Sequence, residues 1–394
     1  MVKTGLLLGA GFSKDFGLPL VTDVTQTLKT WLTPEKFWQI ENAARARGNG
    51  YSDEIAEEIL SVLARDEMHF EAILGHFQAQ EIRSRGDQKA VQVYASLSSW
   101  FARVISEMIW GDPIARLRDF RAVSGEYEAG LRFLVDQNRP LWVFSLNSDL
   151  VVECLAATLG VTIESGLPGK GHLVRRRNDG RQIGELATEI ISGNQLAETG
   201  LVFSTANHVF SSGEHQAIYL VKAHGGLDMF TLHEGKDLLK IAPVGPEAAH
   251  IIADLIYLRN EVALTKSSDP NVVFPSNEYF YEDENGTLQF LRHAFVTGAF
   301  KFDPNYHQTF PRRVLDSFEA YIRFISELVI IGYGFGDDHI NRVIRRWLEM
   351  NKDRRITIVN PSRKEKPGFL LHVSSQVTVL TKTGREYFAS IAGT

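Results

Sequence analysis

Apolar positions along this chain fall into two patterns. Short apolar runs bounded by turn residues are typical of buried parallel strands. Such runs lie at residues 4–9, 141–146, 217–223, 327–333, 355–360 and 376–380. Helical periodicity appears at residues 51–66, 90–110 and 337–350, and one face of the last carries Ile340, Val343, Ile344 and Trp347. Alternating strands and helices predict a Rossmann-like α/β fold with an open, mostly parallel sheet.

Two stretches interrupt this alternation. Residues 34–138 contain no buried strand, and their amphipathic helices predict a helical insertion or subdomain. Residues 165–215 carry hairpin signals, and a further hairpin is predicted within residues 279–291, where Asn-Gly separates two aromatic-rich arms. The predicted domains are a Rossmann-like domain, residues 1–33 and 139–394, and a helical insertion, residues 34–138.

Composition narrows the class of protein. The 394 residues are 44% hydrophobic, which is enough for a substantial core. The net charge is −6 and the densest basic run, residues 174–181, is typical of a solvated hairpin tip, so direct nucleic-acid binding is not expected. Cys154 is the only cysteine, which excludes a multi-cysteine zinc site, and we interpret it as a core residue. No run approaches the roughly 18 apolar residues of a membrane helix, so we predict a cytoplasmic protein.

The first candidate site is the strand–glycine turn–helix sequence LLLGAGFSKDF. Lys14 stands where the dinucleotide fingerprint has its third glycine, so a tight strand–helix turn explains the motif equally well. In the functional interpretation, Gly9 and Gly11 let backbone N–H groups approach a pyrophosphate, and Ser13 adds a hydroxyl donor. The candidate loop comprises Gly9, Ala10, Gly11, Phe12 and Ser13.

Two further candidate segments follow the next predicted strands, at the edge where open α/β sheets bind ligands. In FSLNSDLV, Asn147 and Asp149 come directly after a strand, and an Asx turn with a helix cap is the favoured explanation when this segment is taken alone. In YLVKAHGGLDMF, His224 lies beyond a strand end beside two glycines. We therefore expect the ring of His224 at the edge of a cleft.

The last two candidate segments lie towards the C-terminus. IIGYGFGDDHIN is a second strand–glycine turn–helix, in which Asp337 or Asp338 suits the helix cap. We expect His339 to pack on the helix or to contact a partner, and we interpret residues 208–215 as a loop. No metal ion is predicted. The remaining candidates are Gly332, Tyr333, Asn360 and Pro361.

Taken in chain order, these five segments resemble the sirtuin family and, more closely, the sirtuin-like NAD-consuming proteins of bacterial anti-phage defence. GAGFS is similar to the family's first glycine loop, SLNSD to its Asn-x-Asp segment and KAHGG to its catalytic His-Gly. GYGFGDDHIN resembles a segment of the defence branch, and VNP resembles the adenosine loop. The helical stretch at residues 34–138 has no counterpart in a minimal sirtuin.

The resemblance implies a role for each segment. Asn147 would orient the attacking water or the ribose hydroxyls, Asp149 would hold the nicotinamide carboxamide, and His224 would be the base. A histidine of ordinary pKa, about 6.5, suits proton transfer at neutral pH. The other expected contacts to NAD come from Gly9, Ala10, Gly11, Phe12, Ser13, Gly332, Tyr333, Asn360 and Pro361.

Departures from the family refine the expected activity. The four zinc cysteines of a deacetylating sirtuin are absent, so no zinc ribbon is expected. The first loop lacks the family's Asp-Phe-Arg segment, and no acyl-lysine cleft is recognisable. What remains implies an NAD glycohydrolase that releases nicotinamide and ADP-ribose, or a cyclised form of it, and that acts in phage defence by depleting NAD.

The resemblance also implies partners, because an ungated NADase would kill its host. We expect a homo-oligomer that works with a separate protein, with a HerA-like ATPase favoured over a short Argonaute. The helical insertion is the natural place for oligomer contacts or a lid. The alternatives are an NAD-dependent protein deacylase, a sensor that binds NAD or ADP-ribose without turnover and, more distantly, a nucleic-acid-binding scaffold.

Overall fold

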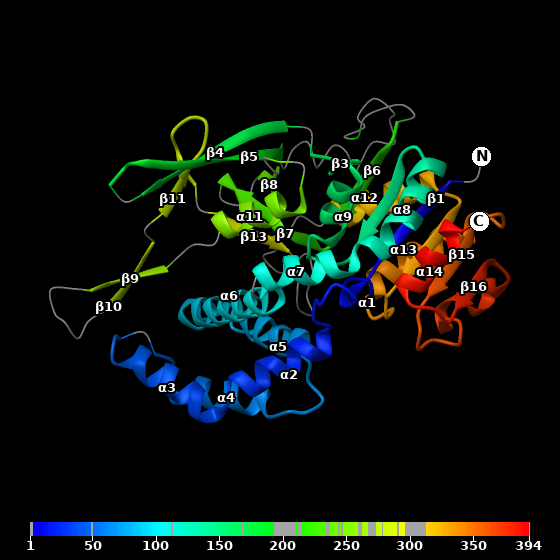
Figure 1. Cartoon of the computed structure of the whole chain (residues 1–394). Coiled ribbons are helices and arrows are strands. Elements are labelled where there is room, and N and C mark those ends of the chain that lie inside the picture. The colour runs from blue at the N-terminus through cyan, green and yellow to red at the C-terminus, as the bar shows by residue number, and fades with distance from the viewer. Residues whose placement is uncertain are drawn as a thin grey trace. The chain divides into compact units, whose positions relative to one another are not determined.

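The chain is described here by a computed structural model. It describes residues 3–393 apart from 49, 112, 168, 178, 193–209, 211–214, 234–236, 243–244, 246, 259–261, 267–272, 278, 290 and 296–312. The loop predicted at residues 208–215 therefore lies mostly outside the described residues. The chain divides into two compact units, which are Met1–Phe16 with Pro113–Phe295 and Thr309–Thr394, and Gly17–Asp112 with Val296–Gln308 (Figure 1).

A seven-stranded parallel sheet organises the first unit. Its strands are β1 (Thr4–Leu8), β2 (Leu141–Ser145), β3 (Thr162–Glu164), β6 (Ala217–Lys222), β14 (Glu327–Ile331), β15 (Arg355–Val359) and β16 (Val377–Leu380), in the order β16-β15-β14-β1-β2-β6-β3. All six predicted strands are present, and β3 is an additional edge strand. Without β3 the order is that of a Rossmann-like doubly wound sheet, which confirms the predicted α/β class. The direction of winding reverses between β1 and β14.

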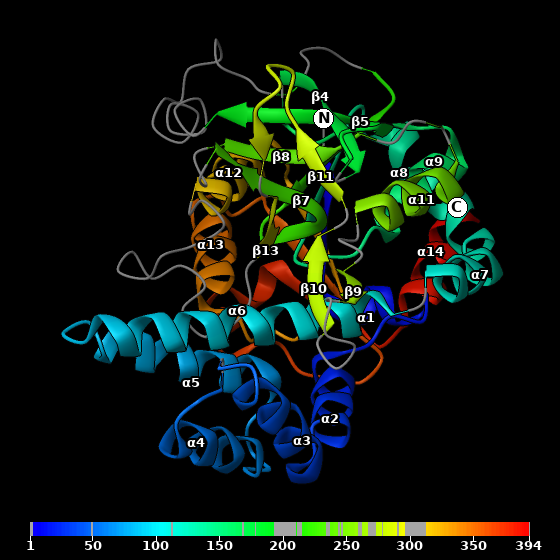
Figure 2. The ribbon, with the colours of Figure 1, turned by 90° about the vertical axis from the view of Figure 1, so that its left-hand side faces the viewer.

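Helices cover both faces of this sheet. Figure 2 shows α12 and α13 on one side of β1, and α8, α9 and α14 on the other. The helices of this unit are α1 (Ala10–Lys14), α7 (Pro113–Val123), α8 (Gly125–Gln137), α9 (Val151–Leu159), α11 (Ala248–Leu258), α12 (Arg313–Tyr321), α13 (Asp338–Glu349) and α14 (Gly384–Ala392), with 3-10 helices η3 (Ile322–Phe324) and η4 (Gly368–Gln376). The predicted apolar face of α13 is buried, as the period of its sequence requires.

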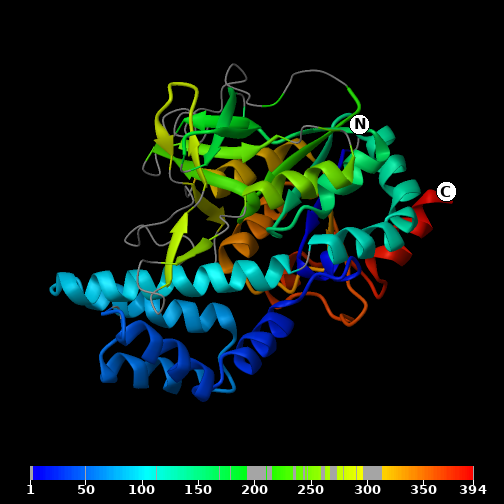
Figure 3. The same ribbon diagram turned by 60° about the vertical axis from the view of Figure 1, so that its left-hand side comes forward.

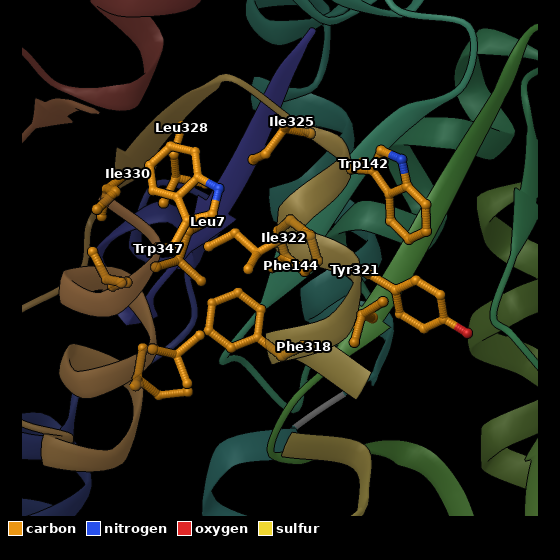
Figure 4. Packing of buried hydrophobic residues seen from close by; sticks show 14 of the residues in the cluster. Leu7, Trp142, Phe144, Phe318, Tyr321, Ile322, Ile325, Leu328, Ile330 and Trp347 are labelled. Atoms are coloured by element: carbon orange, nitrogen blue, oxygen red, sulfur yellow. The ribbon is translucent and has the colours of Figure 1, made fainter. Parts of the chain in front are cut away.

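Every second side chain of each strand points into the core on one face of the sheet. Leu7, Phe144 and Ile330 point from three neighbouring strands toward α12, η3 and α13, where Phe318 and Trp347 meet them (Figure 4). Each of these side chains is almost completely buried. Burial of such large apolar side chains contributes about 1.5–3 kcal/mol each, which fixes the helices on this face.

A second, antiparallel sheet lies in the same unit. Its strands are β4 (Gly169–Arg177), β5 (Gln182–Ser192), β7 (Gly225–Leu232), β8 (Asp237–Ile241), β11 (Tyr279–Glu282), β12 (Leu288–Gln289) and β13 (Arg292–Phe295), in the order β12-β11-β4-β5-β8-β7-β13. The β4–β5 and β11–β12 pairs confirm the two predicted hairpins. The sheet as a whole was not predicted. A separate pair joins β9 (Val262–Lys266) to β10 (Val273–Asn277).

The second unit contains helices α2 (Val21–Trp31), α3 (Pro34–Arg45), α4 (Asp53–Leu63), α5 (Phe70–Arg83) and α6 (Gln88–Trp110). They are the dark blue to cyan ribbons of Figure 3. Its core includes Leu28, Ile59, Ile73, Phe77 and Phe101. Residues 113–138, which the sequence prediction assigned to the helical insertion, are grouped with the sheets in this division. No helix in the described part of the chain combines the length and the apolar character needed to cross a bilayer.

The turns that follow β1 and β14 contact each other through their backbones. The Gly11 N–H donates to the Gly332 carbonyl at 2.9 Å. Gly332 has φ +68°, and a Cβ atom there would lie 2.2 Å from the Phe12 nitrogen. A Cβ atom on Gly9 would lie 2.6 Å from the Cα atom of Tyr333. Side chains at these glycines would therefore push the two turns apart.

Replacing Gly332 with alanine should lower the free energy of unfolding by at least about 2 kcal/mol, because it adds left-handed strain and a backbone clash. Gly334→Ala is the matched control, since a Cβ atom at Gly334 would meet nothing within 4 Å. Urea unfolding of both variants measures the difference. Equal stabilities of the two variants would show that the turns do not need this close approach.

Candidate functional site

Asn147 joins the ends of β1 and β2. Its side chain is buried, and Nδ2 donates to the Gly9 carbonyl at 2.9 Å and to Ser13 Oγ at 2.8 Å. Because β1 and β2 are neighbours in the sheet, one side-chain amide is enough to link the two segments. The glycine loop and the SLNSD segment thus form one hydrogen-bonded unit at the carboxyl edge of the parallel sheet.

Only part of the glycine loop, residues 9–13, is exposed at the surface. The N–H groups of Gly9 and Gly11 donate to backbone carbonyls of the turn that ends β14, each at 2.9 Å. These two donors, which the sequence analysis assigned to a pyrophosphate, are therefore engaged within the protein. Phe12 packs against other aromatic rings and Ser13 accepts from the Asn147 amide, so both side chains point inward. Ala10 and Gly11 are exposed and form the outer rim of the loop.

Asp149 forms the Asx turn that the sequence analysis gave as the alternative to a functional role. Its Oδ1 accepts a hydrogen bond from the Val151 N–H at 3.0 Å, which is an Asx turn at the start of α9. Its backbone carbonyl accepts from Lys222 Nζ at 2.6 Å. The side chain is half-buried at the same edge of the sheet as Asn147. The turn fixes the backbone of Asp149 independently of any ligand.

His224 occupies the passage from one sheet to the other. The parallel strand β6 ends at Lys222, and the antiparallel strand β7 begins at Gly225. The imidazole of His224 is 5% exposed, and its Nε2 lies 3.1 Å from Nε2 of His339. In the sheet, β1 and β2 separate β6 from β14, the strand that precedes His339. The two rings therefore meet at the edge that also carries Gly9 and Asn147.

Asp337 completes this cluster. One oxygen of its carboxylate and one nitrogen of each imidazole, His224 and His339, all lie within 4.8 Å of one another. Asp337 is the N-cap residue of α13, one of the two positions predicted for the cap, but its side chain makes no capping hydrogen bond. His339 contacts His224 rather than only packing on its helix, which corrects the expectation from the sequence. The clue in the sequence was the Asp-x-His spacing directly after a strand and a glycine turn.

Tyr333 anchors the loop between β14 and α13. Its hydroxyl accepts from the Asp337 N–H at 3.2 Å and donates toward Asn341 Oδ1 at 3.2 Å. Burial raises the pKa of the Tyr333 phenol, so it remains a neutral donor. Asn360 and Pro361 follow β15 at the same edge, and Asn360 Oδ1 accepts from the backbone of the turn that it begins.

Four ionisable side chains are buried together on α9 and on strands that include β6 and β7, which flank the His224 turn. They are Glu153 of α9, Lys222 of β6, Asp228 of β7 and Lys240 of β8, and none is more than 5% exposed. Lys222 Nζ lies 2.7 Å from Glu153 Oε1, without an aligned hydrogen bond, and 3.5 Å from Asp228 Oδ1. Lys240 Nζ lies 2.9 Å from Asp228 Oδ2. This cluster links the two sheets on either side of His224.

Burial and the neighbouring lysines shift the pKa values of the two carboxylates in this cluster in opposite directions. Burial alone would raise the pKa of Asp228, but the charges of Lys222 and Lys240 outweigh it and lower that pKa. Burial raises the pKa of Glu153, and the nearby lysines offset this only in part. Asp228 is therefore the principal counter-ion of both lysines. The sequence analysis missed this cluster, although a lysine inside the apolar run AIYLVKA signals a buried partner.

A cavity of about 50 Å³ lies beside the same lysines. Its walls include Lys222, Lys240, Phe210, Met229 and Tyr321. Among the described residues that line it, none belongs to the predicted site. Both lysines on its wall are held by carboxylates, so the cavity does not present a strong binding site for an anion.

Comparison with known proteins identifies no family for this chain, so a functional assignment rests on the geometry of the site. No protein-family model matches the chain, and no curated protein is significantly similar to it. The fold and the contacts described above define a Rossmann-like α/β protein with polar and ionisable side chains gathered at the carboxyl edge of its parallel sheet. Sheets of this order bind ligands at that edge.

Replacing Lys222 with methionine should destabilise the protein by about 3–5 kcal/mol, because it removes one of the two cations that pair with the buried carboxylates of Glu153 and Asp228. Arg385→Met is the control, since Arg385 pairs with Glu126 at 3.2 Å on the surface, where loss of the pair costs at most about 1 kcal/mol. The free energies of unfolding in urea give the comparison. Similar losses in the two variants would argue against a role for the buried cluster in stability.

Proposed function

We propose that this protein is an NAD glycohydrolase that cleaves NAD⁺ into nicotinamide and ADP-ribose, or a cyclised form of it. The observation that carries the proposal is the Asn147 amide bound to Gly9 and Ser13, with His224 at the end of the next strand. These groups share the edge at which a sheet of this order binds dinucleotides. They are also the residues that the sirtuin-like resemblance assigns to the reaction.

The chemistry of the reaction fits these residue types. Breaking the bond between nicotinamide and the ribose builds positive charge on C1′, as in glycoside hydrolysis. Nicotinamide leaves as a neutral molecule, so no general acid is needed. The attacking water must lose one proton, and we assign His224 as the base that accepts it. In the cyclised product a hydroxyl of the substrate replaces water, and the proton goes to the same base.

In this proposal the two polar atoms of the Asn147 side chain, Nδ2 and Oδ1, have different roles. Its Nδ2 is already committed to the Gly9 carbonyl and to Ser13 Oγ. We therefore assign the orientation of the water or the ribose hydroxyls to its Oδ1, which can only accept hydrogen bonds. Such a water is directed by Oδ1 while it gives its proton to the base.

His339 acts in this scheme as a positioning residue. When both imidazoles are neutral, two Nε2 atoms 3.1 Å apart can be hydrogen-bonded only if one donates and the other accepts. The contact therefore couples the tautomer and orientation of His224 to those of His339. Asp149 and the exposed rim of Ala10 and Gly11 complete the proposed NAD contacts, together with Gly332, Tyr333, Asn360 and Pro361.

The resemblance extends the proposal to a biological setting. We propose a cytoplasmic effector of phage defence that stops infected cells by depleting NAD, in a homo-oligomer gated by a separate partner. A HerA-like ATPase is the partner we favour, and a short Argonaute is the alternative. The helical unit is the proposed place for these contacts, and we expect no zinc ribbon like that of deacetylating sirtuins, because the sequence has a single cysteine.

Removing either proposed reaction residue should abolish NAD cleavage. We expect His224→Ala and Asn147→Ala to lose at least about 100-fold in rate, which is the usual contribution of a positioned base or its orienting partner. Mass spectrometry of the products of purified chain and NAD, with and without candidate partners, measures the loss. Circular dichroism checks that each variant is folded.

The matched control is His372→Ala, which removes an exposed histidine paired with Glu349 at 2.6 Å. Its activity should equal that of the unaltered chain. Undiminished cleavage by both site variants would contradict the proposal. Stoichiometric binding of NAD by the unaltered chain without any product would favour the sensor alternative.

A further inference from the structure

Three ligand-type side chains lie close enough together to hold one metal ion. His224, Asp337 and His339 each offer one atom within 4.8 Å of the other two, and the two Nε2 atoms are 3.1 Å apart. Zinc binds nitrogen and oxygen at about 2.0–2.2 Å, which sets tetrahedral ligand atoms roughly 3.3–3.5 Å apart. The two imidazoles thus already have nearly the spacing of ligands to one ion, and one carboxylate oxygen of Asp337 lies within 4.8 Å of both rings' ligand atoms.

The scaffold holds these ligands from two directions. His224 lies in the two-residue passage between β6 and β7, and Lys222 and Asp228, which form a buried ion pair, lie on either side of that passage in the chain. Asp337 and His339 lie at the start of α13, where the Tyr333 hydroxyl accepts from the Asp337 N–H. The Asp337 carboxylate does not cap the helix, although it stands at the capping position. One oxygen of this carboxylate lies within 4.8 Å of a nitrogen of each imidazole.

The donor set selects the kind of ion. Two imidazoles and one carboxylate suit first-row transition metals such as Zn²⁺, Fe²⁺, Co²⁺ and Ni²⁺, whereas Mg²⁺ and Ca²⁺ prefer sets made of oxygen alone. Three protein ligands also leave a coordination position for water. His224 is buried, while Asp337 and His339 are half-buried, so the cluster lies at the edge of the protein interior.

We propose that His224, Asp337 and His339 form a binding site for one divalent transition-metal ion. The consequence for activity rests on the proposed function. A neutral imidazole has a single nitrogen lone pair, so a bound ion that uses it leaves His224 no nitrogen that can accept a proton. Metal occupancy then switches NAD cleavage off, and the same histidine serves either the reaction or the ion.

Zinc binding to the full chain tests the site directly. Competition with a chromogenic chelator should show one Zn²⁺ per chain, and Asp337→Asn or His339→Ala should weaken the affinity by at least about tenfold. His372→Ala is the control and should bind like the unaltered chain. Co²⁺ should give the visible absorption of inner-sphere coordination, and His339→Ala should lose it. Equal Zn²⁺ affinity in all four proteins would overturn the site.

Activity measurements separate this inference from the proposed function. If the chain cleaves NAD, stoichiometric Zn²⁺ should inhibit it and a chelator should restore it, equally in the unaltered chain and in His372→Ala. Cleavage that stays unchanged when the site is saturated with zinc would overturn the switch. Zinc binding that requires Asp337 and His339, in a chain that never cleaves NAD, would support the metal site and contradict the proposed function. Cleavage that is lost in His224→Ala, in an unaltered chain that binds zinc no more tightly than Asp337→Asn does, would support the proposed function and contradict the metal site.

Discussion

The turn after β1 and the turn after β14 touch each other through their backbones, and the rest of the site is arranged around that contact. It occurs where the winding of the parallel sheet reverses, so the two turns leave in opposite directions and expose the strand ends. Gly9 and Gly332 permit the approach because neither position has room for a Cβ atom. Asn147 then reaches the Gly9 carbonyl from the neighbouring strand. A small displacement of either turn would break this bond.

His224 depends on a different kind of interaction. It stands where the chain leaves the parallel sheet and enters the antiparallel one, and the buried ion pairs of Lys222 and Asp228 lie on both sides of it. Buried charges of this kind add little net stability, because desolvation offsets their attraction. They do require one arrangement of the two sheets, since any other arrangement leaves a charge unpaired.

Local sequence patterns predicted the strands well and the contacts between them less well. The six parallel strands and the apolar face of α13 are encoded in runs of neighbouring residues, so periodicity finds them. The antiparallel sheet pairs β4 with β11 and β7 with β13, which are distant in the chain and carry no local signal of their partners. The hairpins within it were predictable because a short turn connects each pair.

The candidate site shows the same division. Gly9, Asn147 and His224 were identified because each follows a buried strand, and the common direction of the strands brings their ends to one edge. The contact between His224 and His339 was not predictable, because it joins residues 115 positions apart across two intervening strands. The engagement of the Gly11 N–H by Gly332 was missed for a similar reason, since it depends on the order of β1 and β14 in the sheet.

The central claim is that the glycine loop, Asn147 and His224 act on one bound dinucleotide. A crystal structure of the His224→Ala protein soaked with NAD tests it most directly. The account predicts the pyrophosphate beside Ala10 and Gly11, with the nicotinamide ribose between Asn147 Oδ1 and position 224. NAD bound away from that edge of the sheet, or no NAD bound at saturating concentration, would contradict it.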